Sequence, residues 1–255
     1  LGASPGLTNI LAQIAISELD EVTKVYTGWD MSSAKLESES SQSGVNAAMV
    51  HGIEQMIGKV KIFKNRNFEM VKPLEKIKID YPDIGESSAY IFGHPEAITL
   101  PHNYPDIAES YNLMHGSERG FIVILKIIRF LINLKIITKN FAAKILTQLE
   151  SLNISDRKED KQVHLPSIYS YAEGVKEKKI TSIGVTIDGD INDFSMGKAT
   201  SLPLATGVKM FIDGKIKKHG VHTPESAVID PKIFFNYFKK GMGDNNELNI
   251  IITKK

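Results

Sequence analysis

The 255-residue chain contains no cysteine, and its charged side chains nearly cancel to a formal net charge of +1. Without cysteine, disulfide cross-links, thiolate metal ligands and a cysteine nucleophile are excluded. A protein with so small a net charge does not produce the positive field with which nucleic-acid-binding proteins attract phosphates. We therefore expect a cytoplasmic protein that has no nucleic-acid partner.

The chain also lacks a clean apolar run of about 20 residues, the length that spans a bilayer as a helix. Its most apolar stretch, Phe121 to Ile137, is interrupted by three cations and an asparagine. We interpret it as a helix buried on most of its surface with one hydrated edge, and expect no membrane partner. A membrane-surface helix is the alternative, because Phe121 to Lys144 contains five Lys or Arg and no acid.

Sequence motifs that bind phosphates or metals are missing as well. The chain has no G-x-G-x-x-G fingerprint, and Gly197 and Lys198 are followed by Ala199 rather than the Ser or Thr of a phosphate-binding P-loop. Its seven histidines show no spacing typical of zinc ligands. We predict no metal site and no complete dinucleotide-binding loop.

Gly2, Ser4 and Gly6 spell G-x-S-x-G, the motif that presents a nucleophilic serine in α/β-hydrolases. That chemistry needs the backbone N–H of the residue after the serine, which here is Pro5 and has none. The favoured interpretation is that Ser4 caps a helix and Pro5 occupies its first turn. The free amides at that helix start would then suit an anionic or polar group.

Hydrophobic periodicity and turn residues predict mixed secondary structure. Helices are expected from Pro5, over Ala47–Ile57, Ser117–Ile137 and Asn140–Leu152, from Thr200 or Ser201 to Phe211 with Pro203 in the first turn, and from Asp230 to Gly241. Strands are expected at Val22–Trp29, Val60–Ile62, Phe68–Met70, Tyr90–Leu100, Ile183–Ile187 and Leu248–Ile252, and loops at the Ser-rich 36–44 and charged 156–162 segments. Strands and helices without a regular βα repeat indicate an α+β protein.

His94, Pro95 and Glu96 place an imidazole and a carboxylate on either side of a residue with a fixed backbone. Such a pair could move protons between the protein and a substrate. An ordinary hydrogen-bonded pair at the end of a loop is the alternative.

Four segments together resemble the saccharopine-dehydrogenase-like oxidoreductases. They are GASPGLTNILA (Gly2–Ala12), GHPEAITLP (Gly93–Pro101), ATSLPLATGVKMFIDGKI (Ala199–Ile216) and GVHTPESAVIDPKIFF (Gly220–Phe235). The resemblance implies that residues 1–20 form the helix after an N-terminal Rossmann domain absent from this chain, and that residues 21–255 form a substrate-binding and dimerisation domain. It also implies a mixed, largely antiparallel sheet with helices packed on one face, as in the C-terminal domain of glyceraldehyde-3-phosphate dehydrogenase.

The reaction that the resemblance implies is an NAD- or NADP-dependent hydride transfer at the C–N bond of an amino acid or polyamine conjugate. The cofactor would be bound mainly by the absent domain, so the chain alone should be inactive, and the protein should be a homodimer. A family member that has lost its chemistry and serves as a scaffold is the alternative.

The resemblance also assigns site residues. They are His94 and Glu96 for substrate contact or proton transfer, Pro5 and Gly6 for the cofactor, and Thr8, Asn9, Thr200, Ser201 and Pro203 for the substrate.

Overall fold

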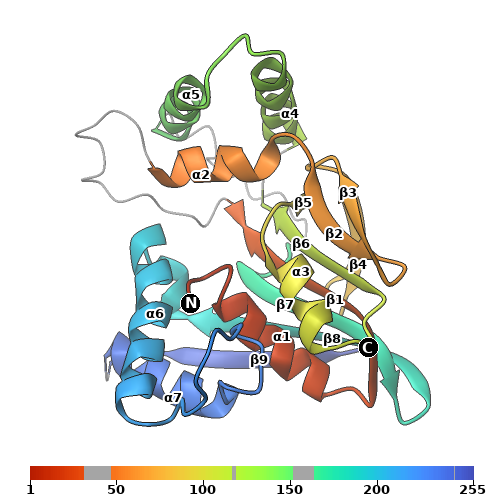
Figure 1. Ribbon diagram of the computed structural model, residues 1–255, viewed down its shortest axis with the longest axis vertical. Helices are drawn as coiled ribbons and strands as arrows, with labels where there is room; N and C mark the ends of the chain where they lie inside the picture. The colour runs from red at the N-terminus through yellow and green to blue at the C-terminus, as the bar shows by residue number, and fades with distance from the viewer. Residues whose placement is uncertain (32–46, 117–118, 152–163, 244) are drawn as a thin grey trace.

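The computed structural model describes residues 1–31, 47–116, 119–151, 164–243 and 245–255, which form an α+β fold (Figure 1). Its helices are α1 (Leu7–Ser17), α2 (Ala47–Met56), α3 (Glu96–Asn103), α4 (Arg119–Asn133), α5 (Lys139–Ser151), α6 (Met196–Ile212) and α7 (Pro231–Met242), with a 3₁₀ turn at Asp190–Asp193. The strands are β1 (Glu21–Asp30), β2 (Val60–Lys64), β3 (Asn67–Val71), β4 (Lys76–Tyr81), β5 (Gly85–Phe92), β6 (Glu109–His115), β7 (Ile168–Lys176), β8 (Lys179–Gly189) and β9 (Leu248–Lys254). The predicted loops at 36–44 and 156–162 lie outside the described residues.

The strands form one mixed sheet in the order β3-β2-β6-β1-β7-β8-β9. The β1–β6 pairing is parallel, and the other pairings described are antiparallel. On its other edge β6 pairs with β2 near its start and with β5 near its end. This sharing brings the carboxyl ends of β1 and β5 to the two sides of β6.

Different layers cover the two faces of the sheet. Helices α1 and α7 pack apolar side chains such as Leu11 and Phe234 against one face, where α3 and α6 also lie (Figure 1). The other face is covered by the β4–β5 hairpin, whose Ile79 and Tyr81 pack against Tyr169 of β7. The predicted α+β class, with a largely antiparallel sheet and helices on one face, is confirmed.

A third apolar cluster joins α2, α4 and α5 beyond the ends of the strands, at the end of the molecule away from α6 and α7 (Figure 1). Helix α4 contributes Ile122, Leu125 and Ile128, which are buried. Its opposite face is exposed, so the prediction that this helix is buried on most of its surface is wrong. Among the described residues, none of the helices is long and apolar enough to cross a membrane.

Three predicted element boundaries are also wrong. Helix α1 begins at Leu7 rather than Pro5, and Ser4 does not cap it. Helix α6 begins at Met196, because the Ser195 hydroxyl accepts a hydrogen bond from the Lys198 amide and caps the helix a turn earlier than expected. The predicted strand over Tyr90–Leu100 ends at Phe92, and α3 follows it.

Gly28 of β1 tests how tightly the sheet packs. It pairs with Tyr169 of β7, and a Cβ atom on Gly28 would lie 2.1 Å from the tyrosine Cζ. We expect Gly28→Ala to lower the free energy of unfolding by roughly 2–4 kcal/mol, measured by urea denaturation. Gly52→Ala is the matched control, because nothing lies within 4 Å of its added Cβ in helix α2. Equal stability of the two variants would contradict the packing.

Candidate functional site

The N-terminal turn, Gly2–Gly6, is held by its own backbone. The Gly2 amide donates to the Pro5 carbonyl at 2.8 Å, and the Leu7 amide donates to the Gly2 carbonyl at 2.8 Å. Gly6 has a φ of 140°, and a Cβ there would lie 2.2 Å from the Gly2 oxygen. Only glycine fits at this closure.

The amides at the start of α1 are not available to a ligand. The Gly6 amide donates to Asn9 Oδ1 at 2.7 Å, and the Leu7 and Thr8 amides donate to the carbonyls of Gly2 and Ala3. The expectation that free amides at this helix start suit an anionic or polar group is therefore wrong. Their partners come from the turn itself, which sequence periodicity does not reveal.

The turn places the Ser4 side chain against the link between β5 and α3. Ser4 Oγ donates a hydrogen bond to Glu96 Oε1 and lies 3.0 Å from His94 Nδ1. Asn112 of β6 donates to Ser4 Oγ at 3.3 Å. One hydroxyl thus joins the two residues of the His-Pro-Glu segment that the sequence singles out.

Glu96 is the buried member of this group, with no exposed surface. Besides Ser4, its Oε1 accepts hydrogen bonds from Thr8 Oγ1 at 2.9 Å and from Asn112 Nδ2 at 3.3 Å. Burial raises the pKa of Glu96, the hydrogen bonds from Ser4 and Thr8 oppose that change, and the charge of Glu225 adds to it. The net effect shifts the protonation equilibrium of this carboxyl group toward its neutral form.

The two oxygens of Glu96 have different surroundings. The donors converge on Oε1, whereas Oε2 is buried and has no hydrogen-bond partner among the described residues. Because Oε1 already accepts these bonds, Oε2 is the oxygen that would carry the proton of a neutral carboxyl group.

His94 is neutral and has a defined tautomer. Burial, with a smaller contribution from the charge of His51, lowers the pKa of His94 to about 4. Since Ser4 donates its single hydrogen to Glu96, its oxygen accepts from the Nδ1–H of His94. Nε2 is then the unprotonated nitrogen of the ring. The ring stacks on Trp29 with 5.8 Å between centroids and meets the edge of Phe92 at 5.1 Å.

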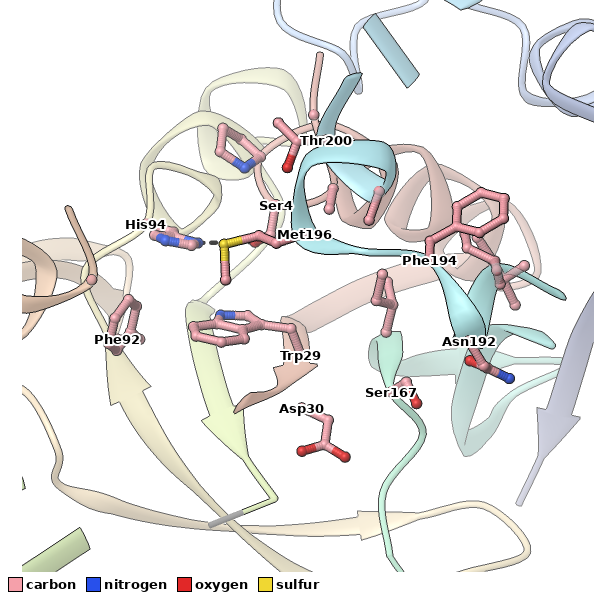
Figure 2. Close-up of a pocket in the computed structure, with 18 of the residues that line it drawn as sticks. Ser4, Trp29, Asp30, Phe92, His94, Ser167, Asn192, Phe194, Met196 and Thr200 are labelled. Carbon is pink, nitrogen blue, oxygen red and sulfur yellow. Dashed lines mark hydrogen bonds between the residues drawn. The ribbon is translucent and has the colours of Figure 1, made fainter. Parts of the chain in front are cut away.

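A cavity of about 560 Å³ adjoins this group and is mainly apolar. It is bounded by the N-terminal turn, the end of β1, the start of α6 and a part of α2. Figure 2 shows the His94 and Ser4 side chains on one side of the cavity and Trp29 below them. The residues that line the cavity include Ser4, Pro5, Trp29, His51, Phe92, His94, Phe194, Met196 and Thr200. Its volume suits a small ligand.

The structure separates the predicted site residues into two sets. His94, Pro5 and Thr200 line the cavity. Glu96, Thr8, Asn9 and Pro203 are buried behind the wall, Gly6 closes the N-terminal turn, and Ser201 is exposed on α6. Glu96 and Thr8 can influence a ligand only through Ser4 and His94, so their predicted direct contact with a substrate is not what the structure shows.

Four contributors were missed by sequence reasoning. They are Trp29 near the end of β1, Asn112 in the middle of β6, the hydroxyl of Ser4 in its hydrogen-bonding role, and Glu225. The residue order held no signal for them, apart from the odd G-x-S-P-G turn around Ser4.

Glu225 ties the loop before α7 to the two helices that support the site. Its carboxylate is 1% exposed and accepts from Asn9 Nδ2 of α1 at 2.9 Å and from Asn103 Nδ2 of α3 at 3.2 Å. This contact fixes the start of α1 relative to α3, and therefore Ser4 relative to Glu96.

No group of three His, Asp or Glu side chains able to hold a metal ion occurs among the described residues.

Comparisons with known proteins identify a family for this chain and a solved structure with a similar fold. A family model described as the saccharopine dehydrogenase C-terminal domain matches residues 2–241. No curated protein matches the sequence. Among solved structures, the fold is similar to apo histidine-tagged saccharopine dehydrogenase (L-Glu forming) from Saccharomyces cerevisiae, with a TM-score of 0.58 and 12% identity. That match covers 98% of this chain and 73% of the yeast chain, and at this identity it shows the fold alone.

The lowered pKa of His94 predicts how stability depends on pH. The unfolded chain protonates this histidine near its ordinary pKa of 6.5, whereas the folded chain does so only near 4. Between these values the unfolded chain binds the extra proton, so the free energy of unfolding falls as the pH falls. We expect a contribution on the order of 2 kcal/mol, absent from His94→Asn, in urea unfolding at pH 7 and pH 4.5. Identical changes in the two proteins would contradict the assignment.

Glu96 offers a second test, because its neutral form should be mimicked by an amide. Glu96→Gln keeps an acceptor for Ser4 and Thr8, and we expect its free energy of unfolding to stay within about 1 kcal/mol of the wild type. Glu96→Leu leaves those buried donors without an acceptor and should cost roughly 2–4 kcal/mol. Thermal and urea unfolding at pH 7 measure both. A Gln variant as unstable as the Leu variant would show that the charged form is required.

Proposed function

Because the chain belongs to the family of saccharopine dehydrogenase C-terminal domains, we propose that it forms the substrate side of a nicotinamide-dependent oxidoreductase acting on a C–N bond. The observation that carries the proposal is the hydrogen-bonded group of His94, Ser4 and Glu96 in the wall of the cavity. It supplies a neutral imidazole next to an apolar space of suitable size for an amine.

The proton transfer follows from the state of His94. Oxidation of an amine to an imine removes a hydride from carbon and a proton from nitrogen, and reduction returns both. A neutral His94 accepts the proton at Nε2, and the resulting imidazolium keeps its Nδ1–H bonded to Ser4. Glu96 acts through Ser4, so it is a positioning residue and never touches the substrate in this account.

The described residues fit only the nicotinamide end of a dinucleotide. The cavity is mainly apolar and has Trp29 and Pro5 in its wall, which suits a ring and a substrate carbon chain. The start of α1, which could have bound a phosphate, uses its amides internally. Pro5 and Trp29 would contact the nicotinamide, NAD or NADP would supply or accept the hydride when bound, and its phosphates would be held by other residues.

Exclusion of water is the further contribution of this chain. Phe92, Phe194 and Met196 give the cavity apolar walls, so an imine formed there would be shielded from hydrolysis. The substrate in this proposal is an amino acid or polyamine conjugate whose carbon chain lies along these walls, with Thr200 at the rim. Homodimerisation through the sheet and a cytoplasmic location are part of the same proposal.

Ligand binding can be tested on this chain alone, because its one tryptophan, Trp29, lines the cavity. We expect its fluorescence to change in a saturable manner when amines or imine analogues are added. Ala199→Phe narrows the cavity without adding a second tryptophan and should weaken that binding at least tenfold. The exposed His164→Ala is the control and should bind normally. A saturable response of equal affinity in both variants would place the ligand elsewhere.

Catalysis is tested with this chain joined to a nicotinamide-binding domain, by following NAD(P)H absorbance with a panel of amines. His94→Gln should lower kcat about 100-fold or more through loss of the proton acceptor, whereas His164→Ala should not. Ser4→Ala should lower kcat and shift its pH profile with little change in KM, because it releases His94 from Glu96. Unchanged turnover in His94→Gln would remove the proton-transfer role. Binding without any turnover in the wild type would favour the scaffold alternative.

A further inference from the structure

Helix α4 carries an apolar stripe on the face opposite to its packed side. Val123, Ile127 and Phe130 of α4, and Leu134 directly after its last residue, follow the spacing that places side chains on one face of a helix. Each is more than half exposed, with Phe130 at 58%. The buried positions Ile122, Leu125 and Ile128 form the packing against α2 and α5, so the exposed stripe is not part of the core that the described residues form.

The apolar surface continues beyond the helix. Ile136, in the turn after α4, is 64% exposed and Phe141 of α5 is 54% exposed. Together with the α4 stripe they form the hairpin patch, defined as Val123, Ile127, Phe130, Leu134, Ile136 and Phe141. Exposed apolar surface of this extent on a folded protein generally marks an interaction site.

Exposed lysines flank the hairpin patch. Lys126, Lys135 and Lys144 are exposed, and the segment from Phe121 to Lys144 contains no acid. Lys139 pairs with Glu54 at 2.7 Å, Arg129 donates to the Pro73 carbonyl, and Lys126 Nζ lies 5.9 Å from the centroid of the Tyr90 ring. Two copies meeting through this face would bring lysines against lysines, which disfavours self-association through it.

We infer that the hairpin patch docks on the surface of an anionic phospholipid bilayer. Apolar side chains flanked by lysines suit the boundary between headgroups and acyl chains, where Phe130 and its neighbours would be buried and Lys126, Lys135 and Lys144 would reach the phosphates. Helix α4 lies parallel to the surface in this mode and does not cross the bilayer.

The position of the patch leaves the cavity accessible. Helices α4 and α5 form the end of the molecule farthest from α6 and α7 (Figure 1). None of the residues of the hairpin patch lines the cavity beside His94. Membrane docking is therefore independent of the proposed oxidoreductase function, and each can fail without the other.

Flotation of the whole chain with vesicles tests the inference. Vesicles of phosphatidylcholine with about one third phosphatidylserine should carry the protein upward, and vesicles of phosphatidylcholine alone should carry much less. Binding should fall as NaCl is raised from about 0.1 to 0.5 M, because salt screens the lysines. Failure to float with the anionic vesicles would overturn the inference.

Substitutions then locate the contact. We expect Phe130→Glu to weaken vesicle binding at least about tenfold, and Lys126→Gln about fivefold. Phe211→Glu on α6 is the matched control, because Phe211 is 66% exposed in a different apolar stripe, and it should bind normally. Circular dichroism verifies that the variants are folded. Equal binding by Phe130→Glu and wild type, or a dimer in sedimentation that depends on Phe130, would overturn the assignment.

Discussion

The site depends on one partly buried contact, the hydrogen bond that Ser4 donates to Glu96. These two residues are 92 positions apart in the sequence. Thr8, in the first turn of α1, donates a hydrogen bond to the same carboxyl oxygen. A carboxyl group without exposed surface is costly to charge, so burial favours its neutral form. The donors that converge on Oε1 leave Oε2 as the oxygen for the proton. The direction of the Ser4 hydrogen in turn sets the tautomer of His94.

Much of the fold could be predicted because its signals are local. Asp230 and Pro231 predict the start of α7. The Asp230 side chain accepts hydrogen bonds from the Lys232 and Ile233 amides and so caps this helix. The hairpin of β2 and β3 turns at Asn65 and Arg66, which both adopt positive φ. One of the four motifs that indicated the family, Gly220–Phe235, contains the Asp230 cap, and the family match over residues 2–241 agrees with all four.

The rest depends on contacts between distant segments. Pro95 followed by Glu96 is a signal for a helix start, but the short apolar pattern and Pro101 inside α3 concealed that helix. Sequence reasoning paired His94 with Glu96 correctly as neighbours in space, and it missed that Ser4 lies between them. The burial of Glu96 and the exposure of Phe130 are both set by which elements cover them, and periodicity reports only that a helix has an apolar face.

The protonation of His94 is the most direct measure of this arrangement. Nitrogen-15 NMR of the histidine side chains, with His94 assigned by comparison with His94→Asn, reads the charge and the tautomer of the ring. The Ser4 contact predicts a neutral ring at pH 7 with its proton on Nδ1, and protonation only near pH 4, where burial places its pKa. A ring that titrates near its ordinary pKa of 6.5, or that carries its proton on Nε2, would contradict the account.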